Sequence, residues 1–283
     1  MDIKRKPNRM KMKQNVSGEA EYLTFPLFED TGLVRHLVST RLGGASNGIF
    51  SSMNLSYTRG DDKEAVDENY RRIAALLGCD VSDIVCSDQT HTTNVRVVNE
   101  CDRGKGIVRP KDYTDVDGMI TNVEGIVLAT FYADCVPLFF IDVKNKAIGL
   151  SHSGWRGTVG RMGQVTIEAM NKEYGSRPED VFAAIGPSIC QDCYEVSEDV
   201  ADAFRKEFSK EGQSDEILLD KGNGKYQLDL WRANQIILEE AGIAPQNIQV
   251  TDICTCCNPD YLFSHRASQG KRGNLGAFLG LLA

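Results

Sequence analysis

Few residues in this chain are suited to metal chemistry, because it contains only four histidines. Two of them stand in polar settings beside apolar, strand-like runs: His91 in CSDQTHTTNVRVV and His152 in SHSGWRGT. Between them, Cys135 lies in FYADCVPLFF, at the junction of two strand-like runs. Two neutral imidazoles and one thiolate leave one position of a tetrahedral zinc ion open for water or substrate. A catalytic zinc lowers the pKa of its bound water towards about 7, so hydroxide becomes available at neutral pH.

The spacing of these three residues differs from that of compact zinc motifs. Cys135 follows His91 by 44 residues and precedes His152 by 17, whereas fingers and zincins place ligands within a few residues of one another. A shared site therefore requires three separate elements to converge. Spacing alone leaves open the alternative of a buried cysteine and two ordinary surface histidines.

The elements that must position these residues are strands and helices in mixed order. Apolar runs rich in β-branched and aromatic residues predict strands, and apolar residues at helical spacing predict helices. The expected strands are residues 95–99, 125–133, 135–143, 147–152, 181–187 and 247–253, with the C-terminal run LGAFLGLLA as a further candidate. The expected helices are residues 64–78, 157–175 and 228–242. Because no Pro/Gly-rich linker divides the chain, we expect residues 20–283 to form a single α/β (α+β) domain around a mixed, buried sheet flanked by helices.

Charge and composition restrict the partners. The net charge of −8 divides into +5 over residues 1–13 and −13 over the remainder. An acidic body argues against nucleic-acid binding, and residues 1–19 are expected to form a basic, disordered tail. No membrane span is expected, since Asp134 and Asp142 interrupt the longest apolar region. Nine cysteines without a signal peptide indicate reduced thiols and a cytoplasmic protein. The sequence does not indicate an oligomeric state.

Six motifs resemble, in order, those of the laccase-domain (multicopper polyphenol oxidase-like) family. They are QTHTTNV (89–95), DVDGMIT (115–121), ADCVPL (133–138), HSGWRGT (152–158), IGPSICQDCYEV (185–196) and CTCCNPDYLFSHR (254–266). The resemblance covers roughly residues 20–270, and the family is also described as zinc-dependent purine nucleoside phosphorylase and as peptidoglycan editing factor. It implies an α/β fold with a β-sandwich-like core, and zinc bound by His91, Cys135 and His152. The chain departs from the family pattern at His265, where Tyr usually follows Phe-Ser, and in the less basic QGKRGNLG.

The resemblance implies phosphorolysis of adenosine, inosine and related nucleosides to the base and ribose 1-phosphate, with adenosine deamination in the same enzyme. The expected partners are then a purine nucleoside and phosphate, and the expected cofactor is Zn²⁺. Copper can occupy such a site in vitro, because it binds these ligands more tightly than zinc. Four histidines, however, cannot supply the several sites of a multicopper oxidase. Zinc deaminases of other folds use an H-x-E unit, but His152 is followed by Ser153 and Gly154, so the general acid/base is not assigned.

Phosphorolysis requires an anion site, and HSGWRGT offers one. Gly154 and Gly157 allow the backbone to turn closely around a ligand, and the following helix N-terminus provides N–H groups for phosphate. Arg156 can add a bidentate contact. Alternatively, Arg156 pairs with a carboxylate and the glycines only form the turn.

Other polar residues in the motifs are candidate substrate contacts or structural groups. Arg41 and Asn54 are candidate ribose or phosphate contacts, and Gln89 is a candidate support for a ligand or the base. Arg41 and Asn54 can equally serve in loop hydrogen bonding. Asp117 is predicted to be a turn residue, and Asp134 should face away from the metal unless the backbone bends there.

Two other functions remain open. Cys135 and His152 can form a nucleophile–base pair that hydrolyses an amide, such as one in a peptidoglycan precursor. The chain can also be a metal-binding protein without turnover. A zinc-bound thiol is shielded from alkylation, whereas a nucleophilic thiol is modified directly.

The remaining cysteines include two C-x-x-C units, Cys190/Cys193 and Cys254/Cys257, with Cys256 inside the second. Cys254 follows Cys193 by 61 positions, which exceeds the usual spacing of a structural zinc ribbon. We therefore expect reduced thiols at these positions.

Overall fold

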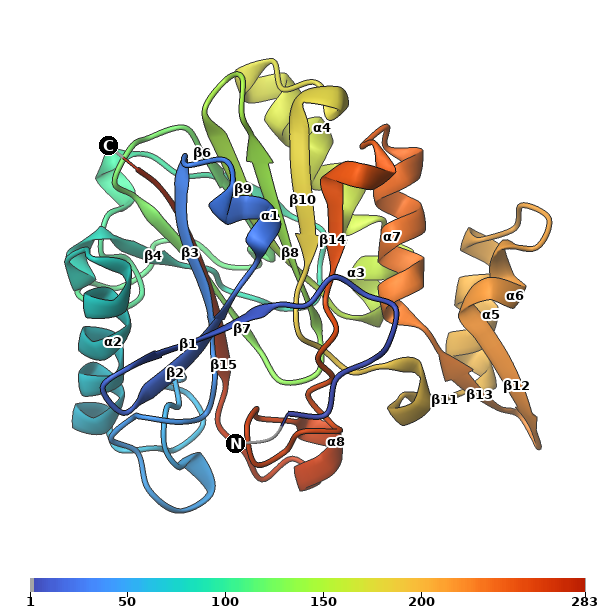
Figure 1. Ribbon diagram of the computed structural model, residues 1–283, viewed down its shortest axis with the longest axis horizontal. Coiled ribbons are helices and arrows are strands. Elements are labelled where there is room, and N and C mark those ends of the chain that lie inside the picture. The colour runs from blue at the N-terminus through green and yellow to red at the C-terminus, as the bar shows by residue number, and fades with distance from the viewer. Residues whose placement is uncertain (1–2, 283) are drawn as a thin grey trace.

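The computed structural model describes residues 3–282, which build two six-stranded sheets packed face to face (Figure 1). In spatial order the first sheet contains β1 (Lys13–Ser17), β2 (Ala20–Thr24), β3 (Val34–Ser39), β15 (Leu275–Leu281), β7 (Val127–Tyr132) and β4 (Ile84–Cys86). The second contains β14 (Ile248–Val250), β10 (Val181–Ile185), β8 (Val136–Asp142), β9 (Ala147–Ser153), β6 (Gly118–Thr121) and β5 (Val95–Val97). A small third sheet contains β11 (Glu195–Ser197), β13 (Lys225–Leu228) and β12 (Leu218–Gly222).

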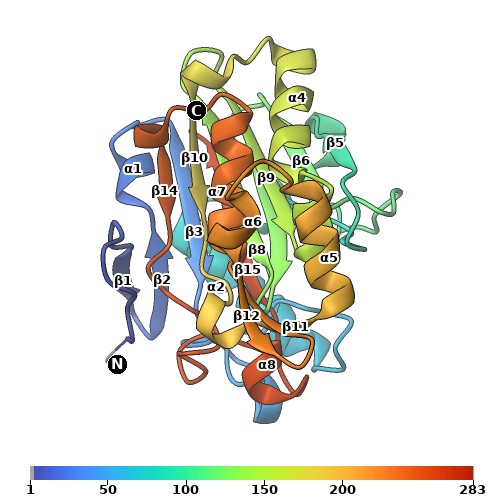
Figure 2. The ribbon, with the colours of Figure 1, turned by 90° about the vertical axis from the view of Figure 1, so that its right-hand side faces the viewer.

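Eight α-helices lie within the described residues, and three of them cover the outer faces of the two large sheets. The eight are α1 (Pro26–Glu29), α2 (Lys63–Leu77), α3 (Trp155–Val159), α4 (Met162–Tyr174), α5 (Glu198–Glu207), α6 (Gln213–Ile217), α7 (Leu230–Glu240) and α8 (His265–Ser268). Helix α2 lies against the first sheet, whereas α4 and α7 lie against the second (Figures 1 and 2). Helices α5 and α6 accompany the small third sheet at one side of the molecule. None of the helices within residues 3–282 combines the length and apolar character needed to cross a membrane.

The side chains of the central strands alternate between two cores. In β8, Phe139 and Ile141 belong to the core between the sheets, while Leu138 and Phe140 belong to the core shared with α4 and α7. Because both faces are covered, this strand reads as a continuous apolar run in the sequence. The order of layers is helix, sheet, sheet, helix. The predicted single α/β domain with a β-sandwich-like core flanked by helices is confirmed.

The predicted helices are present, with one difference. Helix α2 begins after Asp62, whose side chain accepts from the Glu64 N–H, and ends at Gly78 in the left-handed conformation (φ 64°). Residues 157–175 form two helices, α3 and α4, rather than one. The break lies at Arg161, which has a φ of 57° and pairs with Glu207 and Glu240.

One connection between strands determines where Cys135 lies. Strands β7 and β8 are consecutive in the chain but belong to different sheets, so residues 133–135 carry the backbone across the sandwich. Strand β9 returns antiparallel beside β8, with Val136 opposite Ser153 and Pro137 opposite His152. Cys135 and His152 are therefore brought to the same end of the second sheet.

The N-terminal segment differs from the prediction of a disordered tail over residues 1–19. Among the described residues, β1 pairs with β2, Arg5 Nη1 lies 2.5 Å from Asp252 Oδ2, and Met12 is buried. The Lys6 N–H also donates to the Asp252 carbonyl at 2.7 Å. The sequence shows that this segment is positively charged. It does not show that the buried carboxylate of Asp252 pairs with Arg5.

Candidate metal centre

Three elements bring the predicted ligands together. His91 lies in the loop between β4 and β5, Cys135 lies at the crossing between β7 and β8, and His152 lies near the end of β9. One ligand atom from each of these residues lies within 4.8 Å of the other two. The imidazole rings meet edge to face, with centroids 4.9 Å apart. His91 is exposed, Cys135 is partly exposed and His152 is buried, so the group has one side open to solvent.

A buried carboxylate, Asp117, holds the imidazole of His152 and the backbone of the His91 loop in place. Its Oδ1 lies 2.7 Å from His152 Nδ1 and accepts from the His91 backbone N–H at 3.1 Å. Its Oδ2 accepts from the backbone N–H groups of Thr90 and Thr92 at 3.0 and 2.9 Å. An ionised carboxylate is only an acceptor, so the Nδ1 proton stays on His152 and the Nε2 lone pair is left for a metal.

The hydrogen bonds to Asp117 favour its ionised form. The same hydrogen bonds hold the backbone of the His91 loop in an uncommon conformation. Burial opposes ionisation, but the hydrogen bonds from His152 and from the Thr90 and Thr92 amides lower the pKa of Asp117 to about 2. His91 itself has a φ of 68°, a left-handed conformation that is uncommon for a residue with a side chain. The converging amides keep the loop in this conformation. The prediction that Asp117 is only a turn residue is therefore incomplete, because it orients a ligand.

In the absence of a metal, Cys135 and His152 form a pair of opposite charges, a thiolate and an imidazolium. Burial opposes ionisation of the thiol, but the positive charge of His152 and hydrogen bonds from both histidines lower the pKa of Cys135 to about 6. Burial also opposes protonation of His152, whereas the Cys135 thiolate and Asp117 raise the pKa of its ring to about 9. Between these values the metal-free pair is a thiolate and an imidazolium. Binding of a metal must therefore displace the imidazolium proton.

Gly154, directly after β9, gives the site its close packing. A Cβ atom at this position would lie 3.1 Å from Cys135 Sγ and 3.1 Å from His91 Cδ2. Its φ of −73° is open to any residue, so space rather than backbone conformation requires glycine here. The sequence predicted that Gly154 lies close to a bound substrate or phosphate. In the structure it lies against the side chains of Cys135 and His91, two of the candidate metal ligands.

Asp134, next to Cys135, lies between β7 and β8 where the backbone bends (φ 89°), so the alternation expected for a strand does not apply to it. Its carboxylate accepts from Thr255 Oγ1 at 2.6 Å and from the Arg266 backbone N–H at 2.7 Å. The bend therefore connects the metal centre to the segment that follows β14.

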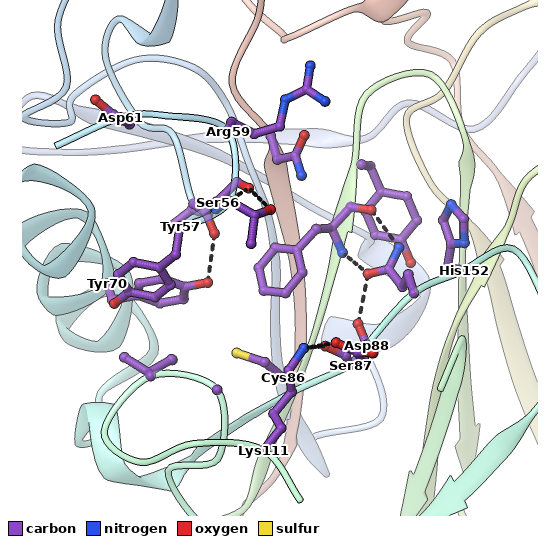
Figure 3. A pocket seen from close by; sticks show the side chains of 18 of the residues that line it. Ser56, Tyr57, Arg59, Asp61, Tyr70, Cys86, Ser87, Asp88, Lys111 and His152 are labelled. Atoms are coloured by element: carbon purple, nitrogen blue, oxygen red, sulfur yellow. Dashed lines mark hydrogen bonds and ion pairs between the residues drawn. The ribbon is translucent and has the colours of Figure 1, made fainter. Parts of the chain in front are cut away.

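A cavity of about 890 Å³ opens beside the three ligands. His91, Cys135 and His152 line one wall, and the opposite walls come from residues 55–63, 106–111 and 272–274. Figure 3 looks into this space, with His152 on one side, Tyr57 and Arg59 on the other and Lys111 below. The cavity is large enough for a nucleoside-sized ligand.

Of the four predicted substrate contacts, all within the described residues, one lines the cavity and three lie outside its wall. Gln89 lines the cavity, and its side-chain amide pairs with the Phe131 backbone at 2.7 and 2.8 Å. Among the described residues, Arg41, Asn54 and Arg156 are not part of the cavity wall. Arg41 donates to the carbonyls of Ser51 and Pro259.

Asn54 and Arg156 have contacts of their own. Asn54 is fully buried and links the loop after β3 to Asn274 and Asp61. The Arg156 guanidinium lies 4.2 Å from the centre of the Trp155 ring, on the first turn of α3.

Most of the residues that line the cavity were not predicted from the sequence, and two of them are Arg59 and Arg272. Arg59 donates to the Gly270 carbonyl at 3.0 Å. Arg272 has a buried Nε with no hydrogen-bond partner among the described residues. Burial and the neighbouring charge of Arg59 lower the pKa of Arg272 to about 10. The Arg272 Nη1 donates to the Gly273 carbonyl at 3.2 Å, so an anion in the cavity would pair with the other N–H groups of this guanidinium.

The donor set fits a single zinc ion better than several copper ions. Only two of the four histidines belong to it. His36 lies in the core, where its Nε2 accepts the Phe25 N–H at 2.8 Å and burial lowers its pKa to about 4. His265 begins α8 and is exposed. Within residues 3–282, no group of histidines resembles the trinuclear set of a multicopper oxidase.

Comparison with known proteins agrees with this geometry. Residues 35–282 match the family described as "Multi-copper polyphenol oxidoreductase laccase". The chain is 37% identical over 247 residues to purine nucleoside phosphorylase YlmD of Bacillus subtilis (strain 168), covering 86% of this chain and 87% of that protein. It is 36% identical over 218 residues to adenosine deaminase RL5 of an unknown prokaryotic organism, covering 77% and 82%. The crystal structure of YlmD from Geobacillus stearothermophilus superposes with a TM-score of 0.88 at 33% identity, covering 97% and 100% of the two chains.

The role of Asp117 can be tested by the substitution Asp117→Asn. An amide nitrogen cannot accept the N–H groups that converge on this position, so we expect zinc affinity to fall by about 10- to 100-fold. Competition with a chromophoric chelator measures the affinity. Asp115→Asn is the matched control, because Asp115 is an exposed carboxylate of the same region that accepts only from Thr90 Oγ1 through its side chain. Equal affinities of Asp117→Asn and wild type would contradict the assignment.

Proposed function

Because this chain belongs to the family described as multi-copper polyphenol oxidoreductase laccase, we propose that it is a zinc-dependent purine nucleoside phosphorylase that also deaminates adenosine. Relatives named purine nucleoside phosphorylase and adenosine deaminase support an enzyme that processes nucleosides. The observation that carries the proposal is the convergence of His91, Cys135 and His152 on the wall of a nucleoside-sized cavity.

Three residues of the chain would hold the zinc ion. His91 and His152 would each offer one imidazole nitrogen and Cys135 its thiolate, with the fourth position facing the cavity. Zinc bound there would supply a Lewis acid and an activated water. Asp117 keeps the Nδ1 proton of His152 in place, so the ring presents its Nε2 towards the other two ligands.

The phosphate is proposed to bind at Arg59 and Arg272. Both guanidinium groups line the cavity, and Arg272 is close enough to Arg59 for their charges to repel. Guanidinium groups bind phosphate oxygens in pairs of parallel hydrogen bonds. Phosphate between them would remove the repulsion and satisfy the unpaired Nε of Arg272.

The nucleoside would then lie between the phosphate and the metal centre. Phe131 and Tyr57 provide aromatic surface on the cavity wall, which suits the flat, apolar faces of a purine. With the base near the metal, C6 can be reached for deamination, and with the ribose near the arginines, C1′ can be reached by phosphate.

Activity should depend on both zinc and phosphate. Protein purified without added metal and loaded with zinc is expected to convert inosine to hypoxanthine and ribose 1-phosphate only when phosphate is present. It should convert adenosine to inosine without phosphate. Chromatography of the products measures both reactions. Cys135→Ala is expected to lose the zinc of this centre and both activities, whereas Cys256→Ala should retain them. A zinc-loaded protein that leaves both nucleosides intact would favour a binding protein without turnover.

The phosphate site is tested by Arg272→Gln. Loss of a charge-assisted contact costs about 1.5–3 kcal/mol, so the KM for phosphate should rise by about 10-fold or more while the zinc content stays constant. Arg272→Lys keeps the charge and should show a smaller increase. Arg156→Gln serves as the comparison, since Arg156 was one candidate phosphate contact in the sequence, whereas among the described residues Arg272 lines the cavity and Arg156 does not. A larger effect of Arg156→Gln would place the anion at α3 instead.

One observation favours a second function, a Cys–His amide hydrolase. In the metal-free protein, Asp117, His152 and Cys135 stand in the order of an orienting carboxylate, a base and a nucleophile, which is the arrangement of cysteine hydrolases. The substrate would then be an amide, such as one in a peptidoglycan precursor. The two functions assign opposite roles to Cys135, as a shielded ligand or as a reactive thiolate.

Alkylation of Cys135 with iodoacetamide distinguishes these functions. In metal-free protein the rate should follow the thiolate population, rising with pH through a midpoint near the pKa of about 6 and staying constant above it. One equivalent of zinc should suppress the reaction by at least about 10-fold if Cys135 is a ligand. The exposed Cys101 provides an internal control for reagent quality. Unchanged alkylation in the presence of zinc, with loss of amidase activity, would support the hydrolase.

A further inference from the structure

A second group of thiols lies outside the metal centre described above. Cys190 and Cys193 follow β10, and Cys254 and Cys257 follow β14. These strands are parallel neighbours, with Ile185 opposite Val250, so their carboxyl ends leave the sheet side by side. A further parallel bridge joins Ser188 to Cys254. The pairing of β10 with β14 brings the two C-x-x-C units together in space. Their long separation in the sequence therefore does not prevent them from binding the same ion.

The four sulfur atoms have the spacing of ligands to one ion. All four lie within 4.8 Å of one another, with Cys193 Sγ 3.5 Å and Cys190 Sγ 3.9 Å from Cys257 Sγ. Four thiolates bound to zinc at about 2.3 Å stand about 3.8 Å apart, as the edges of a tetrahedron. A disulfide would require about 2.05 Å, and all four are free thiols. A four-iron cluster would hold its thiolates around a larger body of atoms.

The surroundings suit buried, negatively charged sulfur. Cys190 and Cys254 are almost fully buried. The backbone N–H groups of Cys190 and Cys257 donate to Cys254 Sγ at 3.2 and 3.4 Å. Backbone N–H groups directed at sulfur stabilise a thiolate, and four clustered thiolates, two of them almost fully buried, require a cation.

We propose that Cys190, Cys193, Cys254 and Cys257 bind one zinc ion in a closed, structural site, separate from the centre at His91, Cys135 and His152. Four protein ligands complete the tetrahedron and leave no position for water, so this site takes no part in catalysis. Cys256 lies between two of the ligands in sequence but is not a member of the group.

The position of the site suggests what it stabilises. Thr255, between the ligands Cys254 and Cys257, donates to Asp134 at 2.6 Å, and Asp134 precedes Cys135. Arg266, farther along the same segment, donates its backbone N–H to Asp134 and its guanidinium to the Cys193 carbonyl. A zinc ion here would fix the loops after β10 and β14 to each other. It would thereby support the crossing that presents Cys135.

The test uses the full chain carrying Cys135→Ala, which removes a ligand of the first centre. Under reducing conditions and with zinc added, this variant is expected to retain one zinc per chain after desalting, measured by elemental analysis. Adding Cys257→Ser should remove that zinc, adding Cys257→His should restore most of it, and adding Cys256→Ser should leave it in place. Absence of zinc from Cys135→Ala, a zinc content unaffected by Cys257→Ser, or the presence of iron instead would overturn the proposal.

A second measurement covers the case in which Cys257→Ser does not fold. Zinc-loaded wild type is treated with iodoacetamide, with and without a strong chelator, and labelled positions are read by mass spectrometry. Cys190, Cys193, Cys254 and Cys257 should become labelled together only after chelation, at least about 10-fold faster than before, whereas Cys101 is labelled in both cases. Independent labelling of the four, or a mass that shows disulfides among them, would exclude the site. Neither outcome bears on the nucleoside chemistry, which is measured at Cys135.

Discussion

The candidate site depends on one buried carboxylate, that of Asp117. It receives the His152 ring at 2.7 Å and the backbone amides of Thr90, His91 and Thr92. Hydrogen bonds to an ionised group in a poorly hydrated interior are stronger than those between neutral groups. A single charge thus fixes the loop after β4 to the start of β6 and to β9. Without it, the His152 ring would lose its orienting partner and the His91 loop would lose the acceptor on which its amides converge.

The third ligand is positioned by the sandwich itself. The chain crosses from the first sheet to the second at residues 133–135, and the antiparallel pairing of β8 with β9 sets Cys135 beside His152. Asp134 takes the left-handed conformation at this crossing and binds the segment after β14. The three ligands therefore come from a loop, a crossing and a strand, each held by different interactions. This explains why they are far apart in the sequence and close in space.

Residue type and local periodicity were enough to predict part of this arrangement. The apolar spacing of residues 64–78 with Gly78 at the end predicted α2. Residue types and spacing left open whether His91, Cys135 and His152 meet; the resemblance to the laccase-domain family implied it, and their ligand atoms lie close together. Features that depend on pairing between distant strands could not be predicted. Asp117 approaches His152 because β6 pairs with β9, and the C-x-x-C units meet because β10 pairs with β14. Arg272 lines the cavity because β15, which follows it, is a central strand of the first sheet.

The same geometry also bears on the choice between metal chemistry and thiol hydrolysis. A hydrolase of the Cys–His type requires Cys135, His152 and an orienting carboxylate. His91 has no role in that mechanism. Yet His91 holds an uncommon left-handed conformation, and its backbone N–H donates to the same carboxylate that orients His152. Its ring meets that of His152 edge to face across from the thiol, and Gly154 leaves space for both. A strained backbone that persists in a well-packed site indicates a function for the side chain it presents. A third metal ligand is the function that this position supports, so His91 favours a metal centre over a cysteine nucleophile.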